Sequence, residues 1–354
     1  MASLLITGGA GFIGANFARY WRTAKPDDGI TVLDALTYAG NRENLDGILD
    51  LDFVHGDIRD EPLVEDLLVG RGIDTIVHFA AESHVDRSIV GPDSFIDTNV
   101  QGTHAMLKAA KRAWLDGSGR PHRFHHVSTD EVYGSLSPED PPFTETTPYS
   151  PNSPYAASKA ASDHLVRAYH HTYGLQVTTS NCSNNYGPYQ FPEKLIPLFL
   201  INALDGRALP IYGDGMNVRD WLHVDDHCRG IELVIDRGVV GETYNIGGGA
   251  ELPNLAVIDI ICAAVDGAFA SDPRLAAYFP KSPAAVARPT ASLRTFVTDR
   301  LGHDRRYAVD ARKIMTQLGY APAEEFRSRF EGTLHWYLQN EAWWRRVLSG
   351  EYRK

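Results

Sequence analysis

The tripeptide Thr129-Asp130-Glu131, a hydroxyl residue followed by two acids, has the residue types best suited to acid–base chemistry in this chain. Eliminating water from an organic substrate requires one group to remove a proton and another to protonate the leaving hydroxyl. Two neighbouring carboxyls can fill both roles if their surroundings keep one protonated and the other ionised. An exposed acidic turn is the ordinary alternative. Neighbours on a regular strand point to opposite faces, so both acids can face one substrate only if a strand ends here.

Tyr155 and Lys159 form a second pair with catalytic potential. The sequence predicts a helix over Pro154–Tyr173, and an i, i+4 spacing on a helix places the phenol and the ammonium on one face. The lysine, joined by a positively charged nicotinamide, would lower the pKa of the phenol toward the working pH, so that Tyr155 could deprotonate an alcohol. Such pairs also occur by chance on helices, so this interpretation depends on a cofactor site elsewhere in the chain.

The glycine-rich segment Gly8–Gly14 has the features of such a cofactor site. It follows an apolar strand and opens a helix, which is the position where glycines bind a dinucleotide. Gly11 lets the backbone approach a pyrophosphate, and Gly14 allows the helix to pack closely on the sheet. The diphosphate would then lie at the positive end of the helix.

Asp34 separates this segment from an ordinary glycine-rich turn. It closes the second predicted strand about 20 residues further on, where an acid binds the hydroxyls of the adenosine ribose. A carboxylate there would repel a 2'-phosphate, and the next residue is Ala35 rather than an arginine. The sequence therefore favours NAD over NADP.

Short apolar runs alternate with helical segments through the first half of the chain, as in a parallel sheet covered by helices on both faces. The predicted strands are Ser3–Thr7, Thr31–Asp34, Asp52–His55, Thr75–Phe79, Arg123–Ser128 and Gln176–Ser180. The predicted helices between them are Phe12–Trp21, Pro62–Val69, Ser94–Ala113 and Pro154–Tyr173. We expect an α/β fold with a doubly wound, Rossmann-like parallel sheet.

The pattern changes after residue 180, where prolines and loop-forming residues separate shorter elements. We interpret residues 1–180 as an NAD-binding Rossmann domain, to which residues 222–248 return, and residues 181–354 as mainly a smaller α/β substrate-binding lobe. Helices are predicted in this lobe at Lys194–Leu204 and Leu255–Val265. The stretch Ala270–Ser292 is rich in Ala, Pro and Ser without a clear period, which predicts a long surface loop.

Composition excludes several other classes of function. The net charge of -11 argues against general affinity for nucleic acid or an anionic membrane, because both would repel an acidic surface. The cysteines Cys182, Cys228 and Cys262 have no metal-ligand spacing, so we expect no metal site, no disulfide and a reducing, cytoplasmic setting. No uninterrupted apolar stretch approaches the roughly 20 residues of a membrane helix, which favours a soluble protein.

Together, the glycine segment, the acid after the second strand and the Tyr-x-x-x-Lys pair resemble the extended short-chain dehydrogenases/reductases that act on nucleotide sugars. Ser128–Gly134, Ser-Thr-Asp-Glu-Val-Tyr-Gly, is similar to the signature of the nucleotide-sugar 4,6-dehydratases. That resemblance implies that Thr129 orients the 4-hydroxyl, Asp130 protonates the leaving 6-hydroxyl and Glu131 removes the proton from carbon 5. Tyr155 would deprotonate the 4-hydroxyl as hydride passes to NAD, which is tightly bound and regenerated in each cycle.

The resemblance also implies where the cofactor and the substrate bind. The expected cofactor residues are Gly8, Gly11, Phe12, Ile13, Gly14, Asp34, Asp57, Ile58, Ala80, Ala81, Asn99, Tyr155 and Lys159. The expected substrate residues are Ser83, His84, Asn184, Glu193, Lys194, Leu195, Asn217, Arg219, Arg300 and His303. The basic residues in this substrate set would neutralise a diphosphate. A single basic residue is more often a solvated surface charge.

The signature implies dTDP-glucose as the substrate and a 4-keto-6-deoxy sugar as the product. Two departures from the family pattern, Leu301 in place of the usual proline and the long Ala270–Ser292 stretch, leave a UDP- or CDP-linked hexose open. An epimerase or a decarboxylase on this scaffold has no evident need for both Asp130 and Glu131, and a non-catalytic NAD-binding regulator has no need for an activated phenol. The resemblance further implies a homodimer formed through helices of the cofactor domain.

Overall fold

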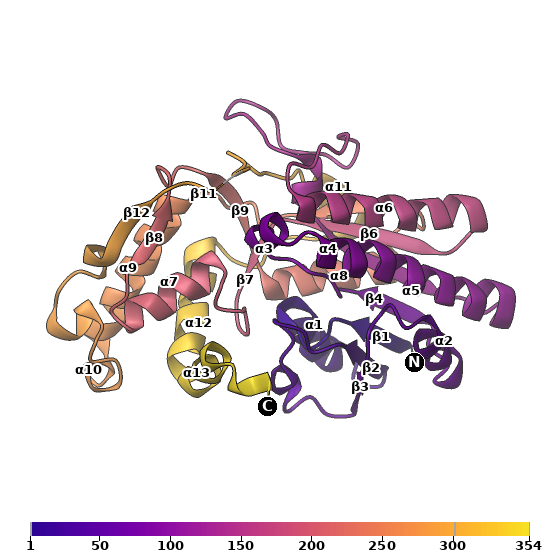
Figure 1. Cartoon of the computed structure of the whole chain (residues 1–354), viewed down its shortest axis with the longest axis horizontal. Coiled ribbons are helices and arrows are strands. Elements are labelled where there is room, and N and C mark those ends of the chain that lie inside the picture. The colour runs from indigo at the N-terminus through magenta and orange to yellow at the C-terminus, as the bar shows by residue number, and fades with distance from the viewer. Residues whose placement is uncertain (1, 301, 354) are drawn as a thin grey trace.

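The alternating apolar segments of the first half fold into a parallel sheet (Figure 1). The computed structural model describes residues 2–300 and 302–353. Within them, seven parallel strands lie in the order β10-β6-β5-β4-β1-β2-β3. Their bounds are β1 Ser3–Thr7, β2 Gly29–Asp34, β3 Leu51–His55, β4 Thr75–His78, β5 Arg123–Thr129, β6 Val177–Cys182 and β10 Thr243–Ile246. This order reverses direction beside β1, so the predicted doubly wound fold is confirmed.

Strand β1 shows why this sheet is covered on both faces. Leu4 and Ile6 are fully buried on one side, in a core shared with α1 and α8. Leu5 is fully buried on the other side, in a core shared with α2, α5 and α6. A strand buried on both faces reads as a continuous apolar run, which is the pattern of parallel sheets. The covering helices are α1 Phe12–Ala24, α2 Glu61–Gly70, α5 Thr103–Ala110, α6 Pro154–Tyr173 and α8 Val224–Arg237.

Helix α6 begins and ends at the predicted residues because both ends carry strong signals. The Ser153 side chain accepts a hydrogen bond from the backbone N–H of Ala156 at 3.1 Å, and Pro154 occupies the first turn. Gly174 ends the helix with a φ of 79°, a left-handed conformation that favours glycine. The neighbouring helical layer is almost continuous and consists of α3 Val85–Val90, α4 Asp93–Phe95, the π-helical turn η2 Ile96–Gly102, α5 and the π-helical turn η3 Lys111–Ser118.

The chain leaves the large sheet after β6 and then returns to it. Strand β10 pairs with β6. Helix α8 packs against α1, and both are labelled in Figure 1. A later helix, α11 Arg312–Leu318, packs on α8 through Ile314 and Leu318. The division of the chain into a cofactor domain and a substrate lobe stays a prediction.

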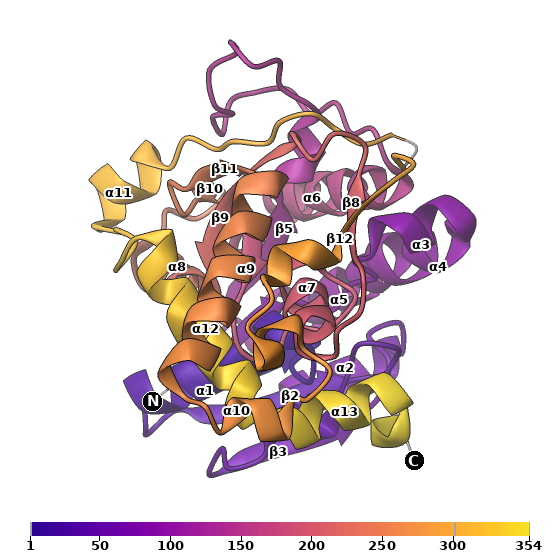
Figure 2. The ribbon, with the colours of Figure 1, turned by 90° about the vertical axis from the view of Figure 1, so that its left-hand side faces the viewer.

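A second lobe forms from the remaining segments, and Figure 2 looks onto it, with α9 and α12 in contact. Its helices are α7 Leu195–Leu204, α9 Asn254–Ser271, α12 Phe326–Gln339 and α13 Glu341–Ser349. Its small sheets contain β7 Asn184–Tyr186, β9 Val218–His223 and β11 Glu251–Pro253, and separately β8 Leu209–Tyr212 and β12 Arg294–Val297. Short 3-10 turns of the described residues include η1 Arg42–Leu45, η4 Asp130–Tyr133 and η7 Glu351–Arg353.

The prediction of a long surface loop over Ala270–Ser292 holds in part: most of the segment is exposed, but it contains short helical turns. Helix α9 continues to Ser271, and the chain then forms the short helical turns α10 Leu275–Tyr278, η5 Pro283–Val286 and η6 Thr290–Leu293. Phe279 is buried and stacks against Trp344, with ring centroids 6.5 Å apart. Turns this short carry no detectable periodicity, so only their packing against α9 defines them.

Helix α9 is long and apolar enough to meet the length and composition criteria of a membrane span. Its buried side, however, forms part of the core of the second lobe, through Val257, Ile261 and Val265. The helix packs against α7 and α12. An apolar helix in this position is accounted for by core packing.

Candidate active site

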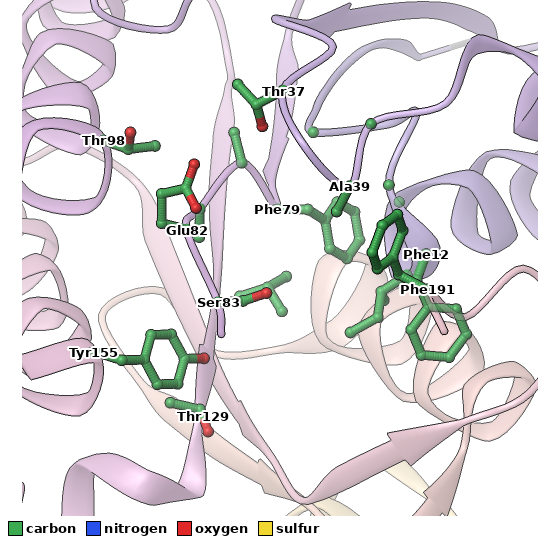
Figure 3. A pocket seen from close by; sticks show the side chains of 18 of the residues that line it. Phe12, Thr37, Ala39, Phe79, Glu82, Ser83, Thr98, Thr129, Tyr155 and Phe191 are labelled. Carbon is green, nitrogen blue, oxygen red and sulfur yellow. The ribbon is translucent and has the colours of Figure 1, made fainter. Parts of the chain in front are cut away.

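A cavity of about 540 Å³ opens at the carboxyl ends of the parallel strands, with residues of both lobes in its wall (Figure 3). This is where doubly wound folds bind their ligands. Most of the residues predicted from the sequence line it: Gly8, Gly11, Phe12, Ile13, Gly14, Asp34, Asp57, Ile58, Ala80, Ala81, Ser83, Thr129, Asp130, Glu131, Tyr155, Lys159, Asn184, Glu193, Lys194 and Leu195. Segments far apart in the sequence therefore meet in one space.

The glycine-rich turn is built so that bare backbone faces this cavity. Gly8 has a φ of 68°, and a Cβ added there would lie 2.7 Å from the Ala80 backbone. A Cβ on Gly14 would lie 2.4 Å from the carbonyl oxygen of Gly8, so only glycine fits. Gly11 precedes helix α1, whose first turn carries no acidic side chain to compete for its free N–H groups. These features fit a diphosphate at the helix N-terminus.

Asp34 is buried beside this turn and is held by backbone groups. Its carboxylate accepts hydrogen bonds from the N–H groups of Ala10 and Leu36, both at 2.8 Å. Burial raises its pKa, and these two N–H groups oppose that shift. Asp57, at the next strand end, forms an ion pair with Arg59 at 2.7 Å.

Strand β5 ends at Thr129, as the function of the acidic pair requires. The chain turns there into η4, and the Thr129 hydroxyl caps this turn by accepting a hydrogen bond from the Glu131 N–H at 3.3 Å. Because the strand alternation is broken, Asp130 and Glu131 both line the cavity. The prediction that a strand ends before the pair is confirmed, and the exposed-turn alternative is wrong.

The two carboxyls have unequal surroundings. Burial, the neighbouring Glu131 and Asp220 raise the pKa of Asp130 well above its usual range. Its Oδ2 atom is buried without a hydrogen-bond partner in the described structure. Burial also raises the pKa of Glu131, but Lys194, Arg300 and Arg219 oppose that shift. This arrangement favours a protonated Asp130 beside a more easily ionised Glu131.

Tyr155 and Lys159 face the cavity from the first turns of α6, and Figure 3 shows the phenol oxygen pointing toward Thr129. The Lys159 ammonium donates a hydrogen bond to the carbonyl of Val127 at 2.9 Å, and burial lowers its pKa. The predicted lowering of the Tyr155 pKa depends on the charge of a bound nicotinamide and stays a prediction. Burial and Glu131 raise that pKa well above its usual range, and the Thr129 hydrogen bond opposes them.

Asp163, one turn beyond Lys159 on α6, was missed by the sequence reasoning. Its carboxylate accepts hydrogen bonds from the Ser128 hydroxyl at 2.9 Å and the Tyr149 hydroxyl at 3.0 Å, and it contacts His126 Nε2 at 3.0 Å. Burial raises its pKa to about 6, and its charge opposes the lowering of the Lys159 pKa. The i, i+4 spacing from Lys159 was the available signal.

Six of the predicted residues do not line the cavity: His84, Asn99, Asn217, Arg219, Arg300 and His303. Asn99 is buried behind the wall, where its amide hydrogen-bonds the backbone of Glu82 and the hydroxyl of Ser158. In this arrangement Asn99 positions the cavity wall through Glu82 and Ser158, and its direct cofactor contact stays a prediction.

The basic residues predicted for the diphosphate surround the Glu131 end of the site. Lys194 donates a hydrogen bond to the Ser83 carbonyl at 2.9 Å. Arg219 is buried, donates to the Asp304 carbonyl at 2.9 Å and lies 4.3 Å from the centre of the Tyr307 ring. The positive charges of Lys194, Arg219 and Arg300 all lower the pKa of Glu131.

Arg300, Asn217 and His303 each contact an aspartate. Arg300 forms an ion pair with Asp86 at 3.2 Å. Asn217 donates to the Asp304 carbonyl at 3.1 Å, and His303 contacts Asp299 at 2.6 Å. The departure noted at Leu301 falls on a residue outside the described structure.

His84 contacts Glu193, which lines the cavity. The His84 Nε2 atom lies 3.6 Å from the Glu193 carboxylate, and Arg87 lies 3.4 Å from the same oxygen. Burial and nearby Lys194 lower the pKa of His84 to about 4, so the imidazole is neutral at neutral pH. In residues 2–300 and 302–353, no cluster of three or more His, Cys, Asp or Glu side chains could hold a metal ion.

Several cavity residues were not predicted from the sequence, and Figure 3 labels Thr37, Ala39 and Thr98 among them. Thr37 and Ala39 lie in the loop after β2, and Thr98 lies in η2, which the fold brings to the same cavity. Only the folded arrangement identifies them.

Comparison with known proteins tests this arrangement. A profile of the family described as "GDP-mannose 4,6 dehydratase" matches residues 5–333. The dTDP-glucose 4,6-dehydratase of Xanthomonas campestris pv. campestris strain B100 is 54% identical over 100% of this chain and 98% of its own length. That of Neisseria meningitidis serogroup B is 52% identical over 100% of this chain and 98% of its own. The chain belongs to the dTDP-glucose 4,6-dehydratase family.

Solved structures of the family agree. The dTDP-glucose 4,6-dehydratase DesIV of Streptomyces venezuelae, crystallised with NAD and dTDP bound, is 50% identical, with a TM-score of 0.86 over 98% of this chain and 99% of its own. The enzyme from Bacillus anthracis, crystallised with NAD, is 42% identical, with a TM-score of 0.84 over 98% of this chain and 100% of its own. This family is an NAD-dependent hydro-lyase branch of the extended short-chain dehydrogenases/reductases. The similarity to it covers essentially the whole chain.

The buried Asp130 carboxyl leads to a pH-dependent prediction. Its pKa is raised above its usual value of 3.8, so the folded protein binds this proton more tightly than the unfolded chain does. Between the pKa of the unfolded chain and the higher pKa of the folded protein, a rise in pH should lower the free energy of unfolding of the wild type relative to that of Asp130→Asn. The expected loss is about 1.4 kcal/mol for each pH unit in this range. Urea denaturation at a series of pH values measures this difference. A difference that is constant with pH would contradict the raised pKa.

Proposed function

We propose that this protein converts dTDP-glucose to dTDP-4-keto-6-deoxyglucose, with NAD as a tightly bound cofactor that is regenerated in each cycle. The observation that carries the proposal is the pair Asp130 and Glu131, which line one cavity with Tyr155 in unequal electrostatic surroundings. Membership of the dTDP-glucose 4,6-dehydratase family supports it.

The residues at the glycine-rich turn fit NAD. The bare backbone of Gly8, Gly11 and Gly14 would hold the diphosphate, and Asp34 would accept hydrogen bonds from the adenosine ribose. Asp57 and Ile58 would lie at the adenine, and Ala80 and Ala81 at the middle of the cofactor. NAD, when bound, would supply a hydride acceptor and donor beside the sugar, and its positive charge would lower the Tyr155 pKa.

Oxidation at carbon 4 is assigned to two hydroxyl side chains, one at the end of β5 and one at the start of α6. Thr129 orients the 4-hydroxyl of the sugar, and Tyr155 removes its proton as hydride leaves carbon 4. Lys159, held by the Val127 carbonyl, keeps a positive charge that stabilises the Tyr155 phenolate, the form that accepts this proton.

Elimination then follows from the new ketone, because a carbonyl at carbon 4 acidifies carbon 5. Glu131 removes the proton from carbon 5. Asp130 delivers its proton to the departing 6-hydroxyl, which leaves as water. NAD, when bound, would supply the hydride that carbon 6 then receives, and Glu131 returns a proton to carbon 5, which completes the 4-keto-6-deoxy sugar. Glu131 is then ionised again, and Asp130 must regain a proton before the next cycle.

Binding of the nucleotide is assigned to the second lobe. Lys194, Arg219 and Arg300 would neutralise the diphosphate, and Asn184, which lines the cavity, would join them by donating from its side-chain N–H groups. Asn217 and His303 would lie near the nucleoside. Ser83, His84, Glu193 and Leu195 would surround the sugar.

We also propose that the protein is a cytoplasmic homodimer. Its three cysteines are buried free thiols, which fits a reducing compartment. The exposed apolar residues Ile89, Val90 and Ile96 lie on α3 and η2, which pack beside α6, and Val90 is 90% exposed. Apolar side chains grouped on one face are typical of a protein contact.

The homodimer is tested by sedimentation. The wild type should sediment at about twice the chain mass of 39.1 kDa. Val90→Asp should shift it toward the monomer, because a charge would be buried in the contact. Val239→Asp, at a 58% exposed position in another loop, is the matched control and should remain dimeric. A monomeric wild type would contradict the proposal.

The substrate is tested by incubating the protein separately with dTDP-glucose, UDP-glucose and CDP-glucose. Alkali-developed absorbance of a 4-keto-6-deoxy product is expected with dTDP-glucose at a rate well above the other two. Preference for UDP- or CDP-glucose would reassign the base specificity. An epimerised hexose without dehydration, or no conversion at all, would favour an epimerase or an NAD-binding regulator and contradict the dehydratase.

The role of Glu131 is tested with Glu131→Gln, whose amide cannot accept the carbon 5 proton. Turnover should fall by at least about 100-fold, the usual contribution of a general base. The variant should still bind NAD and oxidise carbon 4. Reduced cofactor should therefore accumulate, and its near-ultraviolet absorbance measures it. Glu139→Gln, the same change at an exposed position, should leave turnover intact. Unimpaired turnover in Glu131→Gln would remove Glu131 from the elimination.

A further inference from the structure

The end of the chain reaches back from the second lobe to the loop that follows β2. We call α13 and η7, residues 341–353, the C-terminal clasp. Trp343 of the clasp donates a buried hydrogen bond from Nε1 to the Asn44 side-chain oxygen at 2.9 Å. Arg346 forms an ion pair with Glu43 at 2.9 Å. The clasp therefore contacts residues about 300 positions earlier in the sequence.

The loop held by the clasp is part of the cavity wall. Residues 37–40 line the cavity, and Figure 3 shows Thr37 and Ala39 there. Tyr352 donates a hydrogen bond to the Tyr38 carbonyl, and Arg353 donates to the same oxygen at 3.2 Å. The clasp thus fixes this wall at two places, one buried and one near the surface.

Asn44 passes the contact on to the glycine-rich turn. Its side-chain amide donates to the Ala10 carbonyl at 2.9 Å, and the Ala10 N–H donates to Asp34 at 2.8 Å. Trp343, Asn44, Ala10 and Asp34 are all buried. An unbroken series of hydrogen bonds therefore runs from the clasp to the carboxylate assigned to the ribose.

A second set of contacts holds Asn44 in place. Arg19 of α1 donates to its backbone carbonyl at 2.8 Å and stacks over Tyr189, 4.8 Å from the ring centre. Tyr189 packs against Trp343 and Trp336, with ring centroids 5.8 and 4.7 Å away. Asn44 can move only if these contacts break together.

We propose that the C-terminal clasp retains NAD between turnovers by holding the loop of residues 35–45 against the glycine-rich turn. This inference rests on the proposed function, in which NAD is a retained cofactor. A dinucleotide enclosed by these segments leaves only when the wall opens, and opening breaks the buried hydrogen bonds that run through Asn44. Trp343 and Asn44 are positioning residues, since they act through Ala10 and Asp34.

The experiment measures the rate at which NAD leaves the purified protein without any sugar nucleotide. Protein loaded with radiolabelled NAD is mixed with excess unlabelled NAD, and the label that stays bound is followed over time. Trp343→Phe keeps an aromatic ring but loses the Nε1 donor, and should release NAD about tenfold faster, as expected for one lost buried hydrogen bond. Added NAD should restore its turnover.

Trp114→Phe is the matched control, because it makes the same change and also removes a buried Nε1 hydrogen bond, to the Ile73 carbonyl at 2.9 Å, without touching the clasp. It should release NAD at the wild-type rate. Equal release by Trp343→Phe and the wild type, or equally fast release by both variants, would overturn the clasp. If Trp343→Phe does not fold, the double variant Arg346→Gln, Tyr352→Phe replaces it, and wild-type release would count against the clasp. A wild type that binds no NAD would instead contradict the proposed function.

Discussion

Asp130 and Glu131 line one cavity, where two like charges would repel each other through a medium that screens poorly. The site resolves this repulsion by unequal neighbours: Asp220 disfavours a charge on Asp130, and three basic residues favour one on Glu131. Acid and base roles thus follow from position rather than from residue type. The end of β5 at Thr129 is the backbone feature that makes this possible, because a continued strand would turn one carboxyl away from the other.

Much of the first lobe could be predicted because its signals are local. Gly8–Gly14 and Asp34 depend on turn geometry and strand ends, and the caps at Ser153 and Gly174 mark α6 directly. The Tyr155-Lys159 pair needs only helical spacing. Such features are written in neighbouring residues, so the sequence alone locates them.

What could not be predicted depends on distant neighbours. The short turns within Ala270–Ser292 are defined by packing on α9, and the raised pKa of Tyr155 comes from burial and from Glu131, which is distant in sequence. The indirect placement of Asn99 depends on Glu82 and Ser158. None of these contacts leaves a periodic trace in the chain, and each appears only when the segments are brought together in space.

The path of the chain between the two parts of the molecule has a consequence for how it can be divided. After β6 the chain enters the second lobe, comes back through α8 and β10, leaves again with α9, comes back with α11 and ends in the second lobe with α12 and α13. No single cut therefore yields two intact halves: any fragment short of residue 246 lacks a strand of the large sheet. The large sheet and the second lobe therefore cannot be separated by truncation. A gene fusion or a domain exchange would have to transfer the whole segment that contains both.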